Sequence, residues 1–382
     1  MAQAPLSDEL AFEAVDLVRH YGTQAEAAKA LGIPYATFRH RYAVGVQRTA
    51  ALGVEEPYLI RGTSTLFDGE GKAKLQWVKT KEDDKRRMAL MVAAIEKRCE
   101  NITPRPPVPI DVEVTPADEL CNLVTLTDCH VGALAWHREA GEDWDIDIAS
   151  EQLTRSFIGM IHALPAAGTC IINQLGDFLH TDSLVPVTPA QGHVLDADSR
   201  FQKMVEYAVD ILEDIIVAAL QRHARVHIIM AEGNHDESSS VWLRVMFKRL
   251  FRNDTRVTVE DTPLPYYAFQ HGKVMLAFHH GHKLKPAALP GWFAAKYSEM
   301  WGATVARFGH SGHQHHLHEK DEMGMRWLQH PTLAASDAYS ARGGWLSPRE
   351  AIGITYDLEG EAQRIYVRPA MFRDMDAGMN TR

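Results

Sequence analysis

Apolar residues near the start of the chain recur every three or four positions, as amphipathic helices require. Residues 7–20 begin at a capping serine and carry an apolar stripe formed by Leu10, Ala14, Leu17 and Val18. The stretch TQAEAAKALGIPYATFRHRY then predicts a capped helix from Thr23, a turn at Gly32 and a second helix from Pro34. Two short helices joined by a tight glycine turn are typical of a helix-turn-helix.

A helix-turn-helix domain would bind DNA through its second helix. Ala27 and Ala28 allow close helix packing, and Ile33 and Phe38 are expected to fill the core. The residues expected to reach DNA bases or phosphates are Thr37, Arg39, His40, Arg41 and Arg48. The alternative is a helical module for protein interaction or oligomerisation. Residues 1–110 carry 16 Lys+Arg against 14 Asp+Glu, a net charge of only +2, whereas DNA-binding domains usually show a basic excess.

The pattern then changes twice before the larger part of the chain begins. Residues 58–67 and 73–79 predict a β-hairpin, and residues 82–100 predict a charged amphipathic helix. The proline-rich stretch TPRPPVPIDVEVTP reads as an extended linker. The predicted organisation is therefore a helix-turn-helix domain at 1–52, a connector at 53–102, a linker at 103–117 and a second domain at 118–372.

Beyond the linker, short apolar strands are each followed by a polar cluster. These strands fall within residues 122–132, 169–180, 226–237, 273–282 and 305–316, and residues 198–222 predict a long helix. The polar residues at the five strand ends are Asp128 and His130, Asp177 and His180, Asn234 to Asp236, His279 to His282, and His313 to His315. Loops at strand ends are where α/β proteins assemble their sites.

Charge and composition are compatible with metal binding by this second domain, but equally with a solvated acidic surface that carries scattered histidines, and only the spacing of the residues can decide. Residues 111–382 hold 24 Lys+Arg against 36 Asp+Glu, a net charge of −12, and 18 of the 20 histidines. Carboxylates and imidazoles are the ligands that divalent cations prefer. No apolar run approaches the roughly 18 residues of a membrane span, and the N-terminus does not resemble a signal peptide. The four cysteines form no CxxC pair. We therefore expect a cytoplasmic protein that does not enter a membrane.

The motifs DxH, GD, GNHD, HGH and GHxH occur in the order that resembles the calcineurin-like metallophosphoesterases, over about residues 118–340. The resemblance implies an α/β fold, an αββα sandwich of two mixed sheets, that binds two divalent metal ions. Mn²⁺ is the expected ion, with Fe, Zn, Ni or Mg as alternatives. Asp177 would bridge the ions. The other implied ligands are Asp128, His130 and His315 at one ion and Asn234, His280 and His313 at the other.

The resemblance also implies catalytic residues. His235 would be the general acid that protonates the departing oxygen, with Asp236 as its orienting carboxylate. His279 and His280 alternate along a predicted strand, so only one can reach the site. The family's ligand directly precedes a glycine, which selects His280.

Within this family, the position of His180 favours a nuclease. The stretch from Gly176 to His180 resembles the GDxxH motif of the DNA double-strand-break-repair nucleases of this family, although His180 could instead cap the following loop. No DNA-clamping domain like theirs is evident after residue 340. A helix-turn-helix ahead of such a domain is similar to phage or prophage proteins.

The expected activity is thus dinuclear-metal-dependent hydrolysis of a phosphodiester. The expected substrate is DNA, and the expected enzyme class is an exonuclease-like nuclease. One alternative is a phosphomonoesterase or nucleotide phosphodiesterase. Another is a DNA-binding regulator or adaptor whose phosphoesterase domain is inactive. DNA is the expected partner, and a homo-oligomer is possible.

Overall fold

A computed structural model describes residues 8–51, 58–67, 73–82, 102–189, 192–344 and 347–372. The chain divides into two compact units, Met1–Ala94 and Ile95–Arg382, each of which has its own internal packing. None of the described helices is long and apolar enough to cross a membrane.

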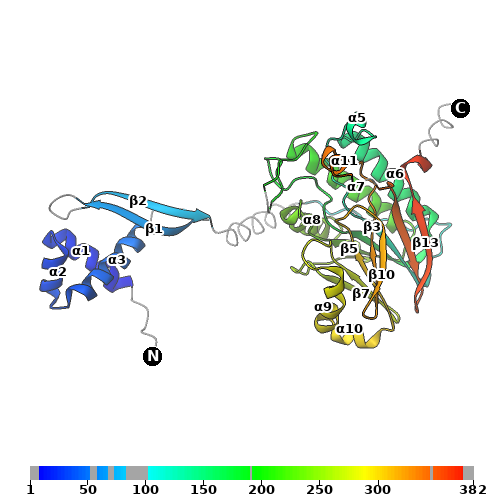
Figure 1. The fold of residues 1–382 in the computed structure, drawn as a ribbon. Helices are drawn as coiled ribbons and strands as arrows, with labels where there is room; N and C mark the ends of the chain where they lie inside the picture. Colours follow the sequence, from blue (N-terminus) through cyan, green and yellow to red (C-terminus); the bar gives the residue numbers. More distant parts are fainter. Residues whose placement is uncertain are drawn as a thin grey trace. The chain divides into compact units, whose positions relative to one another are not determined.

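The first unit begins with three helices, α1 (Asp8–Tyr21), α2 (Gln24–Leu31) and α3 (Tyr35–Ala51) (Figure 1). The hydroxyl of Thr23 accepts the backbone N–H of Glu26 and so caps α2. Gly32 ends α2 with a left-handed φ of 66°, which favours glycine. The core residues are Ala14, Ala27, Ala28 and Phe38. The helices and turn predicted from the sequence are confirmed.

The predicted hairpin is also present in the first unit. Strands β1 (Tyr58–Phe67) and β2 (Ala73–Glu82) pair antiparallel, and β2 is a few residues longer than expected. The helix predicted at 82–100 lies almost entirely outside the described residues.

The second unit contains two mixed sheets. The larger sheet has the strand order β13 (Glu361–Val367), β12 (Ala351–Tyr356), β3 (Ala117–Leu126), β4 (Ala167–Gln174), β5 (Arg225–Met230) and β6 (Val257–Val259). The smaller sheet has the order β10 (His318–Glu322), β11 (Met325–Gln329), β9 (Ala306–Ser311), β8 (Val274–Phe278) and β7 (Tyr267–His271). Strands β3 to β6 are parallel to one another, as are β8, β9 and β11.

Three apolar cores hold these sheets in a four-layer sandwich. Successive side chains of β8 contribute to different cores. Leu276 and Phe278 pack between the two sheets, whereas Met275 and Ala277 face the helices on the other side. Helices α6 (Ile146–Ala163), α7 (Phe201–Leu220) and α8 (Glu237–Leu250) cover the larger sheet, and α9 (Leu289–Lys296) with the neighbouring α10 (Ser298–Ala303) covers the smaller one. The αββα sandwich predicted from the sequence is confirmed.

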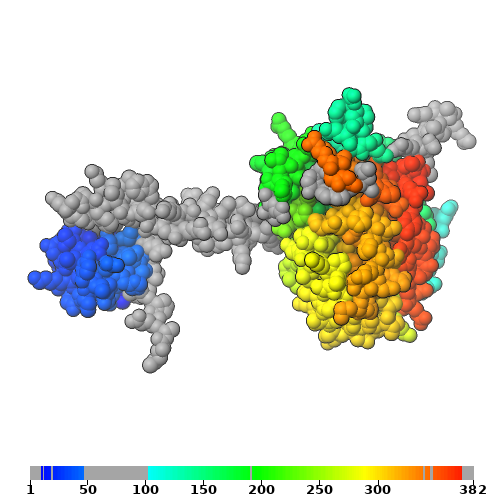
Figure 2. Space-filling model, in the orientation of Figure 1, coloured from blue at the N-terminus to red at the C-terminus, as the bar shows by residue number. Residues whose placement is uncertain are grey.

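Two short helices complete the edge of this unit. In the space-filling view of Figure 2, α11 (Ala338–Gly343) lies against α5 (His137–Ala140), and an ion pair of 3.9 Å joins Arg342 to Glu139. The short helices η1 (Pro286–Ala288) and η2 (Pro369–Phe372) lie before α9 and after β13.

The proline-rich segment that precedes β3 is held on the surface of the second unit. The backbone N–H of Arg105 donates to the carbonyl of Leu250 at 2.8 Å, and that of Val108 donates to the Asp254 carboxylate at 3.2 Å. Its prolines fix φ and carry no backbone N–H group, so fewer N–H groups in this segment need partners. The segment is extended, as expected, and forms part of the second unit's packing.

Candidate metal centre

The sheet topology brings the five polar strand ends together. Strands β3, β4 and β5 are parallel neighbours in the larger sheet, and β8 and β9 are parallel neighbours in the smaller one. Because carboxyl ends of parallel strands meet at one edge, the motif residues that follow them converge.

One cluster joins three of the predicted ligands. Ligand atoms of Asp128, His130 and His315 all lie within 4.8 Å of one another. Nε2 of His315 lies 3.2 Å from Oδ1 of Asp128 and 3.3 Å from Nε2 of His130. Two ligands of one ion, each about 2.1 Å from it, are about 3–3.5 Å apart. The spacing therefore fits a shared cation.

A second cluster contains Asp177, His280 and His313, again within 4.8 Å. Nε2 of His280 lies 3.2 Å from Oδ2 of Asp177 and 4.0 Å from Oδ1 of Asp128, so the two clusters adjoin. Nδ1 of His280 donates to the carbonyl of Leu175 at 2.8 Å. This outer hydrogen bond orients the ring so that Nε2 faces the cluster, where its lone pair would be available to a metal ion.

Asn234, the remaining predicted ligand, directly precedes His235, whose backbone bonds a residue of the second cluster. Its Oδ1 atom is buried and has no hydrogen-bond partner. The next residue, His235, donates its backbone N–H to Oδ1 of Asp177 at 2.8 Å. A buried amide oxygen without a partner is costly unless something else binds it, and a cation would do so without adding charge to the site.

The choice between the two adjacent histidines is clear from their surroundings. His279 faces away from the carboxylates and stacks on Tyr266, with ring centroids 4.7 Å apart. His280 makes the contacts with Asp177 and Asp128 described above. The structure therefore places His280 in the cluster, as expected from the sequence.

Charge balance also fits a cation site. Asp128 and Asp177 are 0% and 2% exposed, and neither pairs with a lysine or arginine among the described residues. Buried carboxylates need a compensating positive charge. Although burial opposes it, the two carboxylates raise the pKa of His280 to about 10. In the metal-free chain a proton on His280 thus supplies part of the charge that divalent ions would provide.

The backbone at this site adopts unusual conformations. Among the described residues, six non-glycine residues have a positive φ, and five of them are predicted ligands: Asp128, His130, Asp177, His313 and His315. A left-handed backbone is unfavourable for such residues and is typical of functional sites.

Two glycines of the motifs leave no room for a side chain. A Cβ on Gly233 would lie 2.0 Å from Oδ1 of Asp177, and one on Gly312 would lie 2.4 Å from Oδ2 of Asp128. The GNHD and GHxH motifs therefore need glycine because the backbone passes directly over the ligand carboxylates.

His180 and His235 lie together at the first cluster. Their rings stack with centroids 5.6 Å apart, and Nδ1 of His180 is 3.3 Å from Nδ1 of His130. Burial and the neighbouring His235 lower the pKa of His180 to about 4, so its ring is neutral near pH 7. Nδ1 of His235 donates to the backbone carbonyl of His180 at 2.9 Å.

The role predicted for Asp236 is wrong. Its carboxylate does not orient the His235 ring, whose Nδ1 is held by His180 instead. Asp236 is fully buried and accepts backbone N–H groups of Gly233, Asp177, Phe178 and Leu179 at 2.7–3.2 Å. It ties the loop after β4 to the loop after β5 because both loops donate to the same carboxylate.

Two further features had no sequence signal that identified them. Asp182 accepts the N–H groups of Ser238 and Ser239 at 2.6 and 2.8 Å and so caps α8 from a distant loop. Glu232, Glu237 and His282 form another group of potential ligand atoms, but Lys283 already pairs with both glutamates.

The residues predicted to bind DNA all lie on α3 in the first unit. Thr37, Arg39 and His40 are exposed, and Arg41 is half-buried. The side chain of Arg48 lies outside the described residues. Phe38, between them in sequence, is buried in the core as predicted.

No protein-family model and no curated protein matches the chain. Among solved structures it is similar to a dimetal phosphatase from Danio rerio (9% identity, TM-score 0.36), with 66% of this chain and 99% of that chain covered. A novel archaeal phosphodiesterase gives 11% identity, a TM-score of 0.32 and coverages of 64% and 99%. A predicted phosphoesterase from Streptococcus pneumoniae has 9% identity and a TM-score of 0.31, with 66% of this chain and 92% of that chain covered. These similarities are distant.

Proposed function

We propose that this protein is a dinuclear-metal-dependent phosphodiester hydrolase that acts on DNA. The observation that carries the proposal is the adjacency of two ligand clusters, with Nε2 of His280 3.2 Å from Asp177 and 4.0 Å from Asp128. Two ions bound there would neutralise a phosphate group and supply hydroxide near neutral pH. The mixed carboxylate, imidazole and amide donors suit Mn²⁺ and other first-row divalent ions.

The chain's own residues supply the proton that the leaving group needs. The hydrogen bond from Nδ1 of His235 to the His180 carbonyl fixes this ring and leaves Nε2 to carry the transferred proton. The backbone N–H of His235 also bonds Asp177, so the acid is held against the ligand cluster. Asp236 positions both loops through its bonds to their backbone N–H groups.

The position of His180 supports a nuclease over a phosphomonoesterase. Its ring lies against His130 and His235, which disfavours the alternative that it only caps the following loop. A neutral imidazole at this place could hydrogen-bond a diester without adding charge. The exposed Thr37, Arg39 and His40 on α3 support DNA as the polymer, because they leave a helix surface that can enter a groove.

Steady-state hydrolysis by the Mn²⁺-loaded full-length protein tests the proposal. The substrates are labelled single- and double-stranded DNA, bis(p-nitrophenyl) phosphate and p-nitrophenyl phosphate. We expect metal-dependent cleavage of DNA and of the small diester, with slower hydrolysis of the monoester. Faster hydrolysis of the monoester would favour a phosphomonoesterase, and no hydrolysis by protein with two bound ions would refute an active enzyme.

The Asp177→Ala variant links activity to the metals. It should bind fewer than two ions per chain and lose hydrolysis of every substrate while the secondary structure survives. Asp210→Ala is a matched control because Asp210 is exposed on α7. Two ions per chain in Asp177→Ala, measured by elemental analysis, would contradict its assignment as the bridging ligand.

A further inference from the structure

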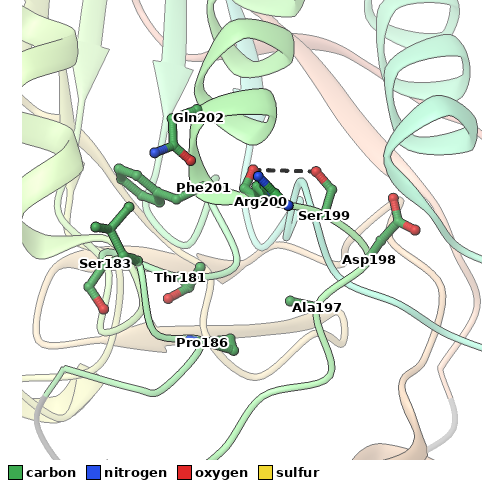
Figure 3. Close-up of a pocket in the computed structure, with 10 residues that line it drawn as sticks. Thr181, Ser183, Pro186, Ala197, Asp198, Ser199, Arg200, Phe201 and Gln202 are labelled. Atoms are coloured by element: carbon green, nitrogen blue, oxygen red, sulfur yellow. Dashed lines mark hydrogen bonds between the residues drawn. The ribbon is translucent and has the colours of Figure 1, made fainter.

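A cavity of about 540 Å³ lies beside the predicted metal centre, in the long segment between β4 and α7 (Figure 3). Residues 175–200 contain no described helix or regular strand, which makes this segment longer than most structureless loops. Loops of more than about 12–15 residues in a compact domain usually serve a function. The volume is within the range of about 300–1,000 Å³ that is typical of small-molecule sites.

Two walls of the cavity continue directly from residues of the metal centre. Thr181 lines it and follows His180 in the chain. Ala197, on the other side, pairs with Ala133 in an isolated β-bridge, and Asp198 donates its N–H to the carbonyl of Gly132 at 3.0 Å. Residues 130–133 thus connect this wall to His130. These connections place the cavity next to His130 and His180 along the chain.

The lining combines the groups that recognise a nucleotide. Phe201 offers an aromatic ring, and Leu184 on the rim is 73% exposed although apolar. Arg200 is exposed, and its guanidinium makes no hydrogen bond or ion pair with any described residue. Figure 3 shows Arg200, Thr181 and Asp198 around the open centre. A free cation in a strongly acidic domain, next to a site for a phosphate, is suited to a second phosphate.

We propose that this cavity is the subsite for the nucleotide next to the scissile bond of a polynucleotide. Phe201 and Leu184 would contact its base, and Arg200 would bind the flanking phosphate. The proposal rests on the proposed phosphodiesterase activity and deepens it, since a small diester has neither a base nor a flanking phosphate to place in the cavity.

The test compares two substrates of the Mn²⁺-loaded full-length protein: a labelled trinucleotide of deoxythymidine and bis(p-nitrophenyl) phosphate. Arg200→Ala should lower kcat/KM for the trinucleotide about tenfold, as expected for loss of a charged hydrogen bond, and leave the small diester within twofold. Phe201→Leu keeps an apolar side chain against the core, and should lower kcat/KM for the trinucleotide at least about fivefold. Arg252→Ala, an exposed arginine after α8, is the matched control and should change neither rate.

Each outcome separates the subsite from the activity itself. Unchanged trinucleotide rates in both variants, or equal losses on both substrates, would overturn the subsite and leave the phosphodiesterase proposal standing. If the unmodified protein hydrolyses neither substrate, the phosphodiesterase proposal fails and the subsite fails with it. Restoration of most trinucleotide activity by Arg200→Lys would support a role for the positive charge.

Discussion

Adding one methyl group at Gly233 should disable the metal centre without unfolding the protein. In Gly233→Ala the new Cβ would lie 2.0 Å from Oδ1 of Asp177 and 2.3 Å from its backbone nitrogen. Real Cβ atoms keep about 3.0 Å from such neighbours, so something must move by about 1 Å. Rotation of the Asp177 side chain relieves only the first contact, because the second is to backbone.

The surrounding hydrogen bonds determine what can move. The backbone N–H groups of Gly233 and Asp177 both donate to Oδ1 of Asp236, at 2.9 and 3.1 Å. The two loops therefore cannot separate without losing one of these buried bonds. A displacement of 1 Å at a catalytic site typically costs about 10²-fold in rate. We expect a loss of at least that size for Gly233→Ala, together with fewer than two bound ions.

The assay combines metal content, hydrolysis of bis(p-nitrophenyl) phosphate and circular dichroism. Gly291→Ala is the control, since this glycine lies in α9 with nothing within 4 Å of an added Cβ. That substitution should leave activity unchanged and stabilise the helix by up to about 1 kcal/mol. Two bound ions and a rate within fivefold of the unmodified protein in Gly233→Ala would refute the steric argument.

Three other predictions concern catalysis, pH and DNA. His235→Ala should keep both ions but hydrolyse DNA about 10²–10⁴-fold more slowly. The loss should be smaller on a nitrophenyl ester, because its leaving group needs little protonation. Equal losses on the two substrates would count against the acid role. Burial lowers the pKa of His223 from 6.5 to about 4 in the folded protein. Because the unfolded chain binds this proton more readily, the stability that is present above pH 6.5 should be lost as the pH falls to 4. Urea unfolding of the metal-free protein measures this effect. Between pH 7 and pH 4, the free energy of unfolding of His223→Gln should fall by about 3 kcal/mol less than that of the unmodified protein. An equal fall in both proteins would contradict the prediction. The double variant Arg39→Ala/Arg41→Ala should bind duplex DNA more weakly, with a salt slope smaller by up to about 1.8, and unchanged binding across a salt series would exclude α3 as the DNA contact.

The convergence of the predicted ligands at one sheet edge could be expected from sequence, because each belongs to a short motif directly after a strand. Which residue binds which ion was implied by the family resemblance. Asp128 follows β3, Asp177 follows β4 and Asn234 follows β5, and these strands are parallel neighbours. Local order along the chain therefore translates into proximity at one sheet edge. Alternation along the chain indicated that only one of His279 and His280 could reach the site, and the family resemblance selected His280.

Roles that depend on distant loops could not be predicted in this way. Asp236 follows His235, so its sequence position suggested a contact with that ring. Its actual partners in the loop after β4 are 57 to 59 residues away in the chain. Asp182 caps α8 across a similar separation. His310 is likewise held by a residue distant in the chain, since it is buried and its Nδ1 lies 3.0 Å from Nε2 of His330.

The hydrogen bonds to Asp236 explain how one residue of the predicted metal centre, Asp177, keeps an unfavourable backbone conformation. Five predicted ligands have a left-handed φ, and each such residue costs on the order of 1 kcal/mol or more. The total is comparable to the whole stability of a typical domain, about 5–15 kcal/mol. Asp177 retains this conformation because its N–H, and those of the next two residues, are bonded to one buried carboxylate. The last residue of GNHD therefore shapes the loop that carries the aspartate of GD, which is why the two motifs work as a pair.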